Sequence, residues 1–189
     1  MTNNVGTQNL VSPPDDKTVS TLKSGDRIFI DGIIYTARDQ AHQKLVDLIK
    51  EGKPLPFDLN GQIIFYAGPV INNNFEISAI GPTTAGRMDN FLEPLLKAGI
   101  KATIGKGPRK PEVKEALKKY KAVYLIATGG AAALLAQTIK KAEIVAFPEL
   151  GPEAIFRLEV SKFPAIVAYD SEGGDIFEEG IKKYAKEVG

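Results

Sequence analysis

The sequence predicts a mixed α/β fold, in which mixed sheets are covered by helices. Two strand-like runs stand close together early in the chain, Asp26–Ile30 and Ile33–Thr36, as expected of a hairpin. Later strand-like runs alternate with helical patterns, which is typical of parallel strands joined by helical crossovers. A length of 189 residues suits one well-buried core, so we expect a single domain over residues 24–189.

Residues 1–23 differ from the rest of the chain. They are rich in Asn, Thr, Ser, Pro and Asp, and follow neither the strand period nor the helix period. We therefore expect an extended N-terminal arm that packs only against a partner. The domain proper is then expected to begin with the hairpin, because Asp31-Gly32 between the two runs is a strong hairpin signal.

A helix is predicted over Asp39–Lys50, since apolar residues recur there at helical spacing and Gly52-Lys53-Pro54 follows. Further β-rich or continuous apolar runs predict strands at Gln62–Ala67, Glu76–Ile80, Lys101–Ile104, Ala122–Ala127, Glu143–Phe147 and Pro164–Tyr169, with a turn at Asn72-Asn73-Asn74. Helical spacing, a closing glycine or an initial proline predicts helices at Asp89–Lys97, Pro111–Tyr120, Ala131–Lys140 and Asp175–Glu187.

The composition excludes several classes of function. Lys and Arg total 24 against 23 Asp and Glu, so no net field would hold a nucleic acid or an acidic membrane surface. No apolar run approaches the roughly 20 residues of a membrane span, and the polar start lacks a signal-peptide pattern, so we expect a cytoplasmic protein. With no Cys and one His, the chain is not expected to bind an iron–sulfur cluster or zinc by itself.

Four segments place polar or cationic groups where a predicted strand ends, which is the usual position of sites in α/β proteins. They are Arg38–His42, Gly81–Arg87, Gly105–Gly107 and Thr128–Gly130. Their glycines allow a ligand to approach the backbone, and arginine offers a planar fork suited to a carboxylate. Together the segments predict a site that holds an anion.

Taken singly, most of these segments also have a purely structural interpretation. Thr128-Gly129-Gly130 could be turn chemistry, Arg38 and Asp39 could form a surface pair, and His42 could pack or cap. The segment from Gly81 to Asp89 differs, because two hydroxyls, an arginine and an acidic residue lie between a strand and a helix with no packing need for that combination.

Six stretches of this sequence resemble the β region of class I fumarases and tartrate dehydratases. They are ARDQAH (37–42), IGPTTAGRMD (80–89), IGKG (104–107), ATGGAAALLAQTIK (127–140), and FPELGPEAIFRLEV (147–160) followed by FPAIVAYDSEGGD (163–175). The resemblance covers the chain from about Ser24 to the C-terminus, in the family's order. Residues 1–23 are not part of it.

The resemblance implies a swivelling β/β/α domain, which is a separate β chain in the two-subunit enzymes. It also implies a partner α subunit that carries a 4Fe-4S cluster, an α2β2 heterotetramer, and a small dicarboxylate substrate. Thr83 matches the proposed catalytic base, Arg38, Arg87 and Lys106 match residues that hold carboxylates, and His42 matches a histidine near the substrate. The neighbouring Asp39, Thr84, Gly129 and Gly130 are further candidates for the site.

One departure from the family concerns the loop after Lys106, where Pro108 follows Gly107 in place of the common Asn and removes a backbone donor. The motifs are shared by fumarases and tartrate dehydratases, and we expect fumarate as the substrate because it is the commoner one. A tartrate dehydratase β subunit and a non-catalytic anion-binding module are the alternatives.

Overall fold

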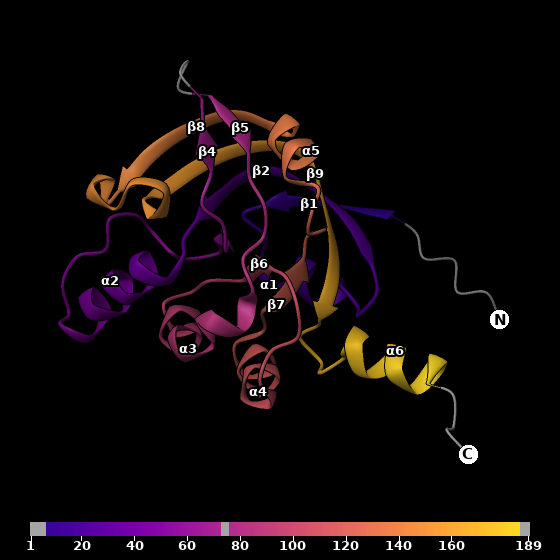
Figure 1. Cartoon of the computed structure of the whole chain (residues 1–189). Coiled ribbons are helices and arrows are strands. Elements are labelled where there is room, and N and C mark those ends of the chain that lie inside the picture. Colours follow the sequence, from indigo (N-terminus) through magenta and orange to yellow (C-terminus); the bar gives the residue numbers. More distant parts are fainter. Residues whose placement is uncertain (1–6, 73–75, 186–189) are drawn as a thin grey trace.

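The computed structural model describes residues 7–72 and 76–185. The chain forms two β layers and a layer of helices, with the curved strands β8, β9 and β2 above β6 and β7, with α3 and α4 below, and with α2 to the left (Figure 1). The mixed α/β fold class predicted from the sequence is therefore confirmed. Among the described residues, no helix combines the length and the apolar character that crossing a bilayer requires.

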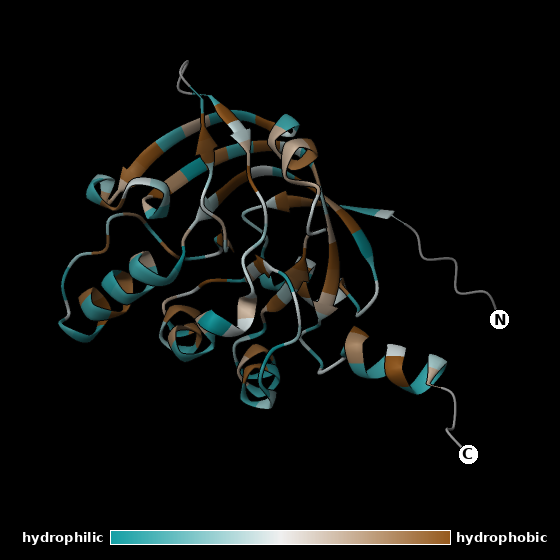
Figure 2. Ribbon diagram, viewed as in Figure 1, coloured by the Kyte–Doolittle hydropathy of each residue, from teal (hydrophilic) through white to brown (hydrophobic). Residues whose placement is uncertain are grey.

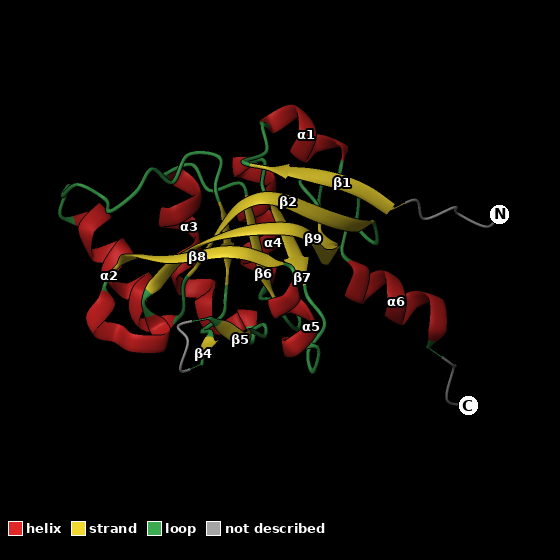
Figure 3. Ribbon diagram, turned by 90° about the horizontal axis from the view of Figure 1, so that it is seen from above, coloured by secondary structure: helices red, strands yellow, loops and turns green. Residues whose placement is uncertain are grey.

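Seven strands form one sheet. They are β1 (Thr7–Ser12), β2 (Arg27–Thr36), β3 (Ile63–Phe65), β6 (Ala102–Gly105), β7 (Val123–Ile126), β8 (Ile139–Ala146) and β9 (Ile155–Tyr169), while β4 (Val70–Ile71) and β5 (Ile77–Ala79) form a separate pair. The order is β1-β2-β3-β6-β7-β9-β8, and β2 also pairs with β9. Because β2 pairs with both β3 and β9, the strands β2, β3, β6, β7 and β9 close into a ring. Figure 3 shows β1, β2, β9 and β8 side by side over β6 and β7.

The helices are α1 (Asp16–Thr21), α2 (Asp39–Lys50), α3 (Asp89–Lys97), α4 (Pro111–Tyr120), α5 (Ala132–Gln137) and α6 (Ile176–Tyr184), with 3-10 segments η1 (Ala85–Met88) and η2 (Pro148–Glu153). The bounds predicted for α2, α3 and α4 are confirmed. Each of these three helices presents an apolar stripe to the sheet and a polar face outward (Figure 2).

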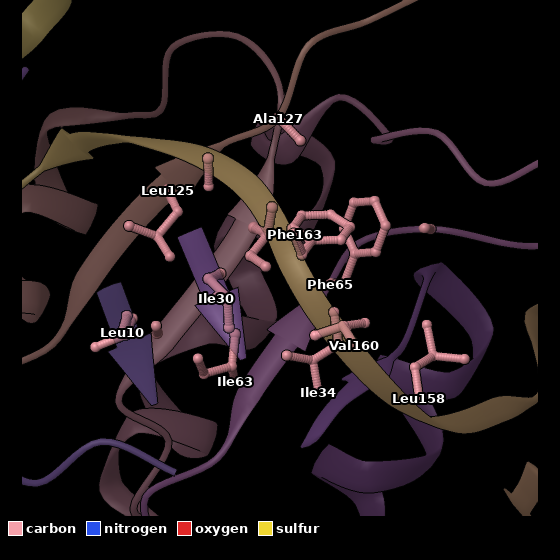
Figure 4. Packing of buried hydrophobic residues seen from close by; sticks show 14 of the residues in the cluster. Leu10, Ile30, Ile34, Ile63, Phe65, Leu125, Ala127, Leu158, Val160 and Phe163 are labelled. Carbon is pink, nitrogen blue, oxygen red and sulfur yellow. The ribbon is translucent and has the colours of Figure 1, made fainter. Parts of the chain in front are cut away.

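The core has two parts, one on each side of the parallel strands. Along β3, Ile63 and Phe65 face the interior of the strand ring, whereas Ile64 and the following Tyr66 face the helices. Figure 4 shows the first of these clusters, with Phe65 against Phe163 of β9. Strands that are buried on both faces read as continuous apolar runs, which is why the parallel strands were recognisable in the sequence.

The predicted hairpin at Asp31-Gly32 is wrong, because β2 runs through it as one strand of 10 residues. Opposite this point β9 bulges, and the Asp31 carboxylate accepts hydrogen bonds from the Lys162 amide (3.0 Å) and the Ser161 hydroxyl (3.1 Å). Gly32 has φ of 109°, and a Cβ there would lie 2.5 Å from the Ser12 carbonyl oxygen. The Asp-Gly pair therefore serves a bulge and a close strand contact.

The predicted extended arm is also not what the structure shows for residues 7–23. β1 pairs in parallel with β2, and α1 follows it, capped by the Asp15 carboxylate on the Thr18 amide at 2.7 Å. Leu10, Val19 and Leu22 are buried in the core inside the strand ring. This segment packs against its own chain because its few apolar side chains close one end of that core. Residues 1–6 lie outside the described residues.

Several other boundaries shift. β8 starts earlier than predicted, α5 is shorter, and β9 extends from Ile155 through Pro164 to Tyr169. Pro164 lies after the last pairing of β9 with β8, at Val160, and before the first with β7, at Ile166, so its missing N–H falls where one edge has no neighbour. Residues 73 and 74 of the predicted Asn turn, and residues 186 and 187 of the predicted last helix, lie outside the described residues.

Candidate functional site

The candidate site lies at the edge of the sheet where β2, β3, β6 and β7 end. The four strands stand in the order β2, β3, β6, β7, and each is parallel to the next. Their carboxyl ends therefore point the same way and deliver Arg38, Tyr66, Lys106 and Thr128 to one edge. This is the position at which open parallel sheets bind ligands.

The segment Thr83–Ala85 is laid alongside the end of β6 by three backbone hydrogen bonds. The Thr83 amide donates to the Tyr66 carbonyl (2.6 Å), the Lys106 amide to the Thr83 carbonyl (3.1 Å), and the Ala85 amide to the Lys106 carbonyl (2.9 Å). Gly105 permits this approach, since a Cβ there would lie 2.9 Å from the Ala85 Cβ. The structure thereby brings Thr83 and Thr84 next to Lys106, as one bridged pair of segments.

Arg38 stands at the N-terminus of α2, with its side chain lying over Gly68. A Cβ at Gly68 would be 3.3 Å from the Arg38 Nη1 atom, so a larger residue would push the guanidinium away. Its Nη2 is 3.7 Å from the Glu153 carboxylate of η2, and its Nε is buried without a hydrogen-bond partner among the described residues. Arg38 therefore has bonding capacity that its neighbours do not use.

Arg87 makes a two-pronged contact with Asp39, through its Nε (3.0 Å) and its Nη2 (2.8 Å). The pair joins η1 to the first turn of α2, and the Arg87 side chain remains 52% exposed. A fork that already holds one carboxylate has the geometry to hold another. Asp39 therefore keeps Arg87 oriented, and a substrate carboxylate would have to share or displace it.

Lys106 is exposed, and its ammonium makes no ion pair with the described residues. The Thr128-Gly129-Gly130 turn lies beside it, because a Cβ on Gly129 would be 3.8 Å from the Lys106 Cδ. Gly130 has φ of 82°, which a residue with a side chain rarely adopts. Gly129 thus borders the lysine, whose charge is available to a ligand.

His42 does not lie at this surface. It is fully buried among Tyr66 and Phe91, and its Nδ1 donates to the Arg38 carbonyl oxygen at 2.8 Å. Burial lowers the pKa of His42 to about 4, so the imidazole is neutral at pH 7. Within this chain His42 supports the Arg38 backbone from beneath, and its nearness to the substrate stays a prediction.

One pair close to the site was not singled out from the sequence. Arg109 follows the Lys106 loop, and its Nε donates to the Asp89 carboxylate at 2.7 Å, with both side chains almost completely buried. Asp89 had been noted only as part of the segment that begins at Gly81. In the sequence Arg109 directly follows Gly107-Pro108, a position that is equally typical of a solvent-exposed arginine.

Comparison with known proteins bears directly on this arrangement. The family described as the Fumarase C-terminus matches residues 3–180 of the chain. This chain belongs to the Fumarase C-terminus family. The family match begins at residue 3 and so includes most of the segment that was predicted to lie outside the resemblance, in agreement with the packing of β1 and α1.

Relatives within the Fumarase C-terminus family carry two kinds of name. The "Putative L(+)-tartrate dehydratase subunit beta" of Methanocaldococcus jannaschii is 47% identical, over 88% of this chain and 89% of that protein. The L(+)-tartrate dehydratase subunit beta of Escherichia coli K12 is 35% identical, over 94% and 90%. The anaerobic class I fumarate hydratase of the same organism is 42% identical, over 83% of this chain but only 29% of that protein.

Proposed function

We propose that this chain is the β subunit of a two-subunit iron–sulfur hydro-lyase that hydrates fumarate reversibly to (S)-malate. The observation that carries the proposal is the meeting of Arg38, Arg87, Lys106 and Thr83 at one edge of the sheet, in a family whose members are named hydro-lyases. The cations hold the substrate carboxylates, and Thr83 is the base that takes the proton from carbon.

The chemistry explains why these residue types belong together. Removing a proton from the carbon beside a carboxylate moves negative charge onto that carboxylate in the transition state. Fixed cations next to it lower the barrier, and Lys106 and Arg38 both have unused bonding capacity. A threonine hydroxyl is a weak base in water, so Thr83 depends on activation by the adjacent cations or by the partner subunit.

We assign the cluster to a partner chain. This chain contains no cysteine, and its described residues include no group of three or more His, Cys, Asp or Glu that could hold a metal ion. In our proposal a partner α subunit carries the 4Fe-4S cluster, the two chains assemble as an α2β2 heterotetramer in the cytoplasm, and this chain alone is inactive. The β-subunit names of relatives that this chain matches almost end to end support that division.

Tartrate is the second candidate substrate, and one observation favours it. The relatives that this chain covers to about nine tenths of their length are named tartrate dehydratase β subunits, whereas the fumarate hydratases are about three times longer than the region matched. In our proposal either substrate would bind to the same cationic residues, and the assay below distinguishes the two.

The proposal is tested by co-expressing this chain anaerobically with a cluster-bearing α subunit and assaying fumarate, (S)-malate and both tartrates. We expect turnover by the complex and none by this chain alone. Arg87→Lys should lower kcat/KM about 10- to 150-fold, since a two-pronged charge-assisted contact is worth about 1.5–3 kcal/mol. Arg157→Lys, which alters an ion pair to Glu143 on β8, is the matched control. A complex inactive on all four compounds would favour a non-catalytic anion-binding module.

A further inference from the structure

Arg109 is a fully buried guanidinium between the parallel strands and the helices. Its Nε donates to Asp89, and its Nη1 donates to the hydroxyls of Tyr66 (3.2 Å) and Thr103 (3.3 Å). Burial acts to lower the pKa of Arg109, but the Tyr66 phenol and the Asp89 carboxylate raise it on balance, so the group stays charged. Its Nη2 is buried without a partner among the described residues.

The Asp89 carboxylate links Arg109 to two segments of the candidate site. Asp89 begins α3, immediately after the η1 turn that carries Arg87, and its second oxygen accepts from the Lys110 amide at 3.1 Å. The Arg87 turn and the chain that follows Lys106 are therefore fastened to the same carboxylate.

Two tyrosines complete the connections. The Tyr66 carbonyl accepts from the Thr83 amide, while the Tyr66 hydroxyl accepts from Arg109. The Tyr124 hydroxyl donates to the Gly107 carbonyl at 2.8 Å. Their rings lie 5.3 and 5.1 Å from the Arg109 guanidinium carbon, which therefore sits between them.

We propose that Arg109, acting through Asp89, Tyr66 and Tyr124, is a positioning residue that fixes Thr83, Arg87 and the Lys106 loop relative to one another. The inference rests on the proposed function of those three groups. Stability alone does not call for such a pair, because a buried ion pair is often no more stabilising than apolar residues of the same volume. Arg109 reaches Asp89 from its Nε and the two hydroxyls from its Nη1, and the single nitrogen of a lysine does not reproduce that spacing.

The first test needs no activity and uses amide hydrogen exchange of the free chain. In Arg109→Lys, the amides of Thr83, Ala85 and Lys106 should exchange about tenfold faster or more relative to the core amide of Val123. Unchanged relative protection of those three amides would overturn the proposal.

Two further variants distinguish a local effect on the site amides from a general loss of stability. Leu117→Ala opens the buried face of α4 without removing any bond of Arg109, so it should leave the relative protection of the site amides unchanged. Tyr124→Phe removes a single hydroxyl and keeps the ring, so it decides the matter if Arg109→Lys does not fold. It should speed relative exchange at Lys106 about fivefold, and wild-type protection there would refute the network.

The second test uses the assembled enzyme. Arg109→Lys should lower kcat/KM about 10- to 100-fold, because small displacements of positioned groups have effects of that size. Combined with Lys106→Ala, its effect should be far less than additive, whereas Leu117→Ala should add independently. Additive losses with Lys106→Ala would overturn the positioning role. If the wild-type complex turns over no dicarboxylate, the proposed function fails, and hydrogen exchange still decides the positioning separately.

Discussion

At the scale of single residues, the backbone at Thr83 is more firmly defined than the chemistry of its hydroxyl. Its amide and its carbonyl are both engaged, with Tyr66 and Lys106, so the residue is held between two strand ends. Thr84 beside it is exposed and bridges Lys106. The two residues have identical side chains in different environments, so each is a control for the other.

We expect Thr83→Val to lower kcat of the assembled enzyme by about 10²- to 10⁴-fold with a smaller change in KM, since it deletes the base and keeps the shape. Thr83→Ser should retain measurable turnover, and Thr84→Val should have little effect. Exchange of the carbon-bound proton of malate with solvent should disappear in Thr83→Val. Exchange at the wild-type rate would show that the base lies elsewhere, on the partner subunit.

His42 makes stability depend on pH in a predictable direction. Its pKa is about 4 in the folded chain against 6.5 in the unfolded chain, so between these values the unfolded state binds more protons. Neutral His42 contributes roughly 3 kcal/mol to the free energy of unfolding. This contribution is fully present above pH 6.5 and is lost as the pH falls toward 4. His42→Phe should remove this part of the pH dependence, measured by urea unfolding at pH 4.5 and 7. An equal loss of stability in both proteins would contradict it.

At the scale of elements, the N-terminal segment illustrates how a weak pattern can belong to the core. β1 alternates exposed and buried residues only in part, and α1 has only 6 residues. Neither element therefore has a clear hydrophobic periodicity in the sequence. β1 is held by pairing with β2 and by the burial of Leu10 inside the strand ring. Local propensity contributes little to such an element, and tertiary burial decides it.

Leu10→Ala should lower the free energy of unfolding by about 2–5 kcal/mol, as expected for a large residue truncated in a packed core. Val11→Ala, one position along and 68% exposed, should change it by about 0.5 kcal/mol or less. Denaturant unfolding of the free chain measures both. An arm that packs only against a partner would give small changes for both substitutions.

At the scale of the whole molecule, the long strands β2 and β9 hold the two β layers together. β9 pairs with β8, β2 and β7 along its length, and β2 pairs with β1, β9 and β3. This closure leaves the ends of the parallel strands as the edge that carries the site, with helices covering one face (Figure 1). The edge offers cations from three separate parts of the chain, at Arg38, Arg87 and Lys106.

The sequence by itself determined the fold class, the family resemblance and the central helices. Continuous apolar runs and clear helical spacing specify these elements locally, and the segments Arg38–His42 and Gly81–Arg87 were placed at strand ends for the same reason. The proximity of Thr83 and Lys106 did not follow from the strand pattern, because the segment that carries Thr83 comes after β5, which pairs only with β4 and lies outside the main sheet.

Only the tertiary structure decided what depends on contacts between distant segments. Asp31-Gly32 has the local chemistry of a turn, but the Lys162 bulge and the Ser12 contact make it part of a continuous strand. His42 and Arg109 each read as a plausible surface or site residue, and their burial becomes visible only when the helices cover the sheet. A residue's charge and spacing are written in the sequence, whereas its solvent exposure is set by segments far along the chain.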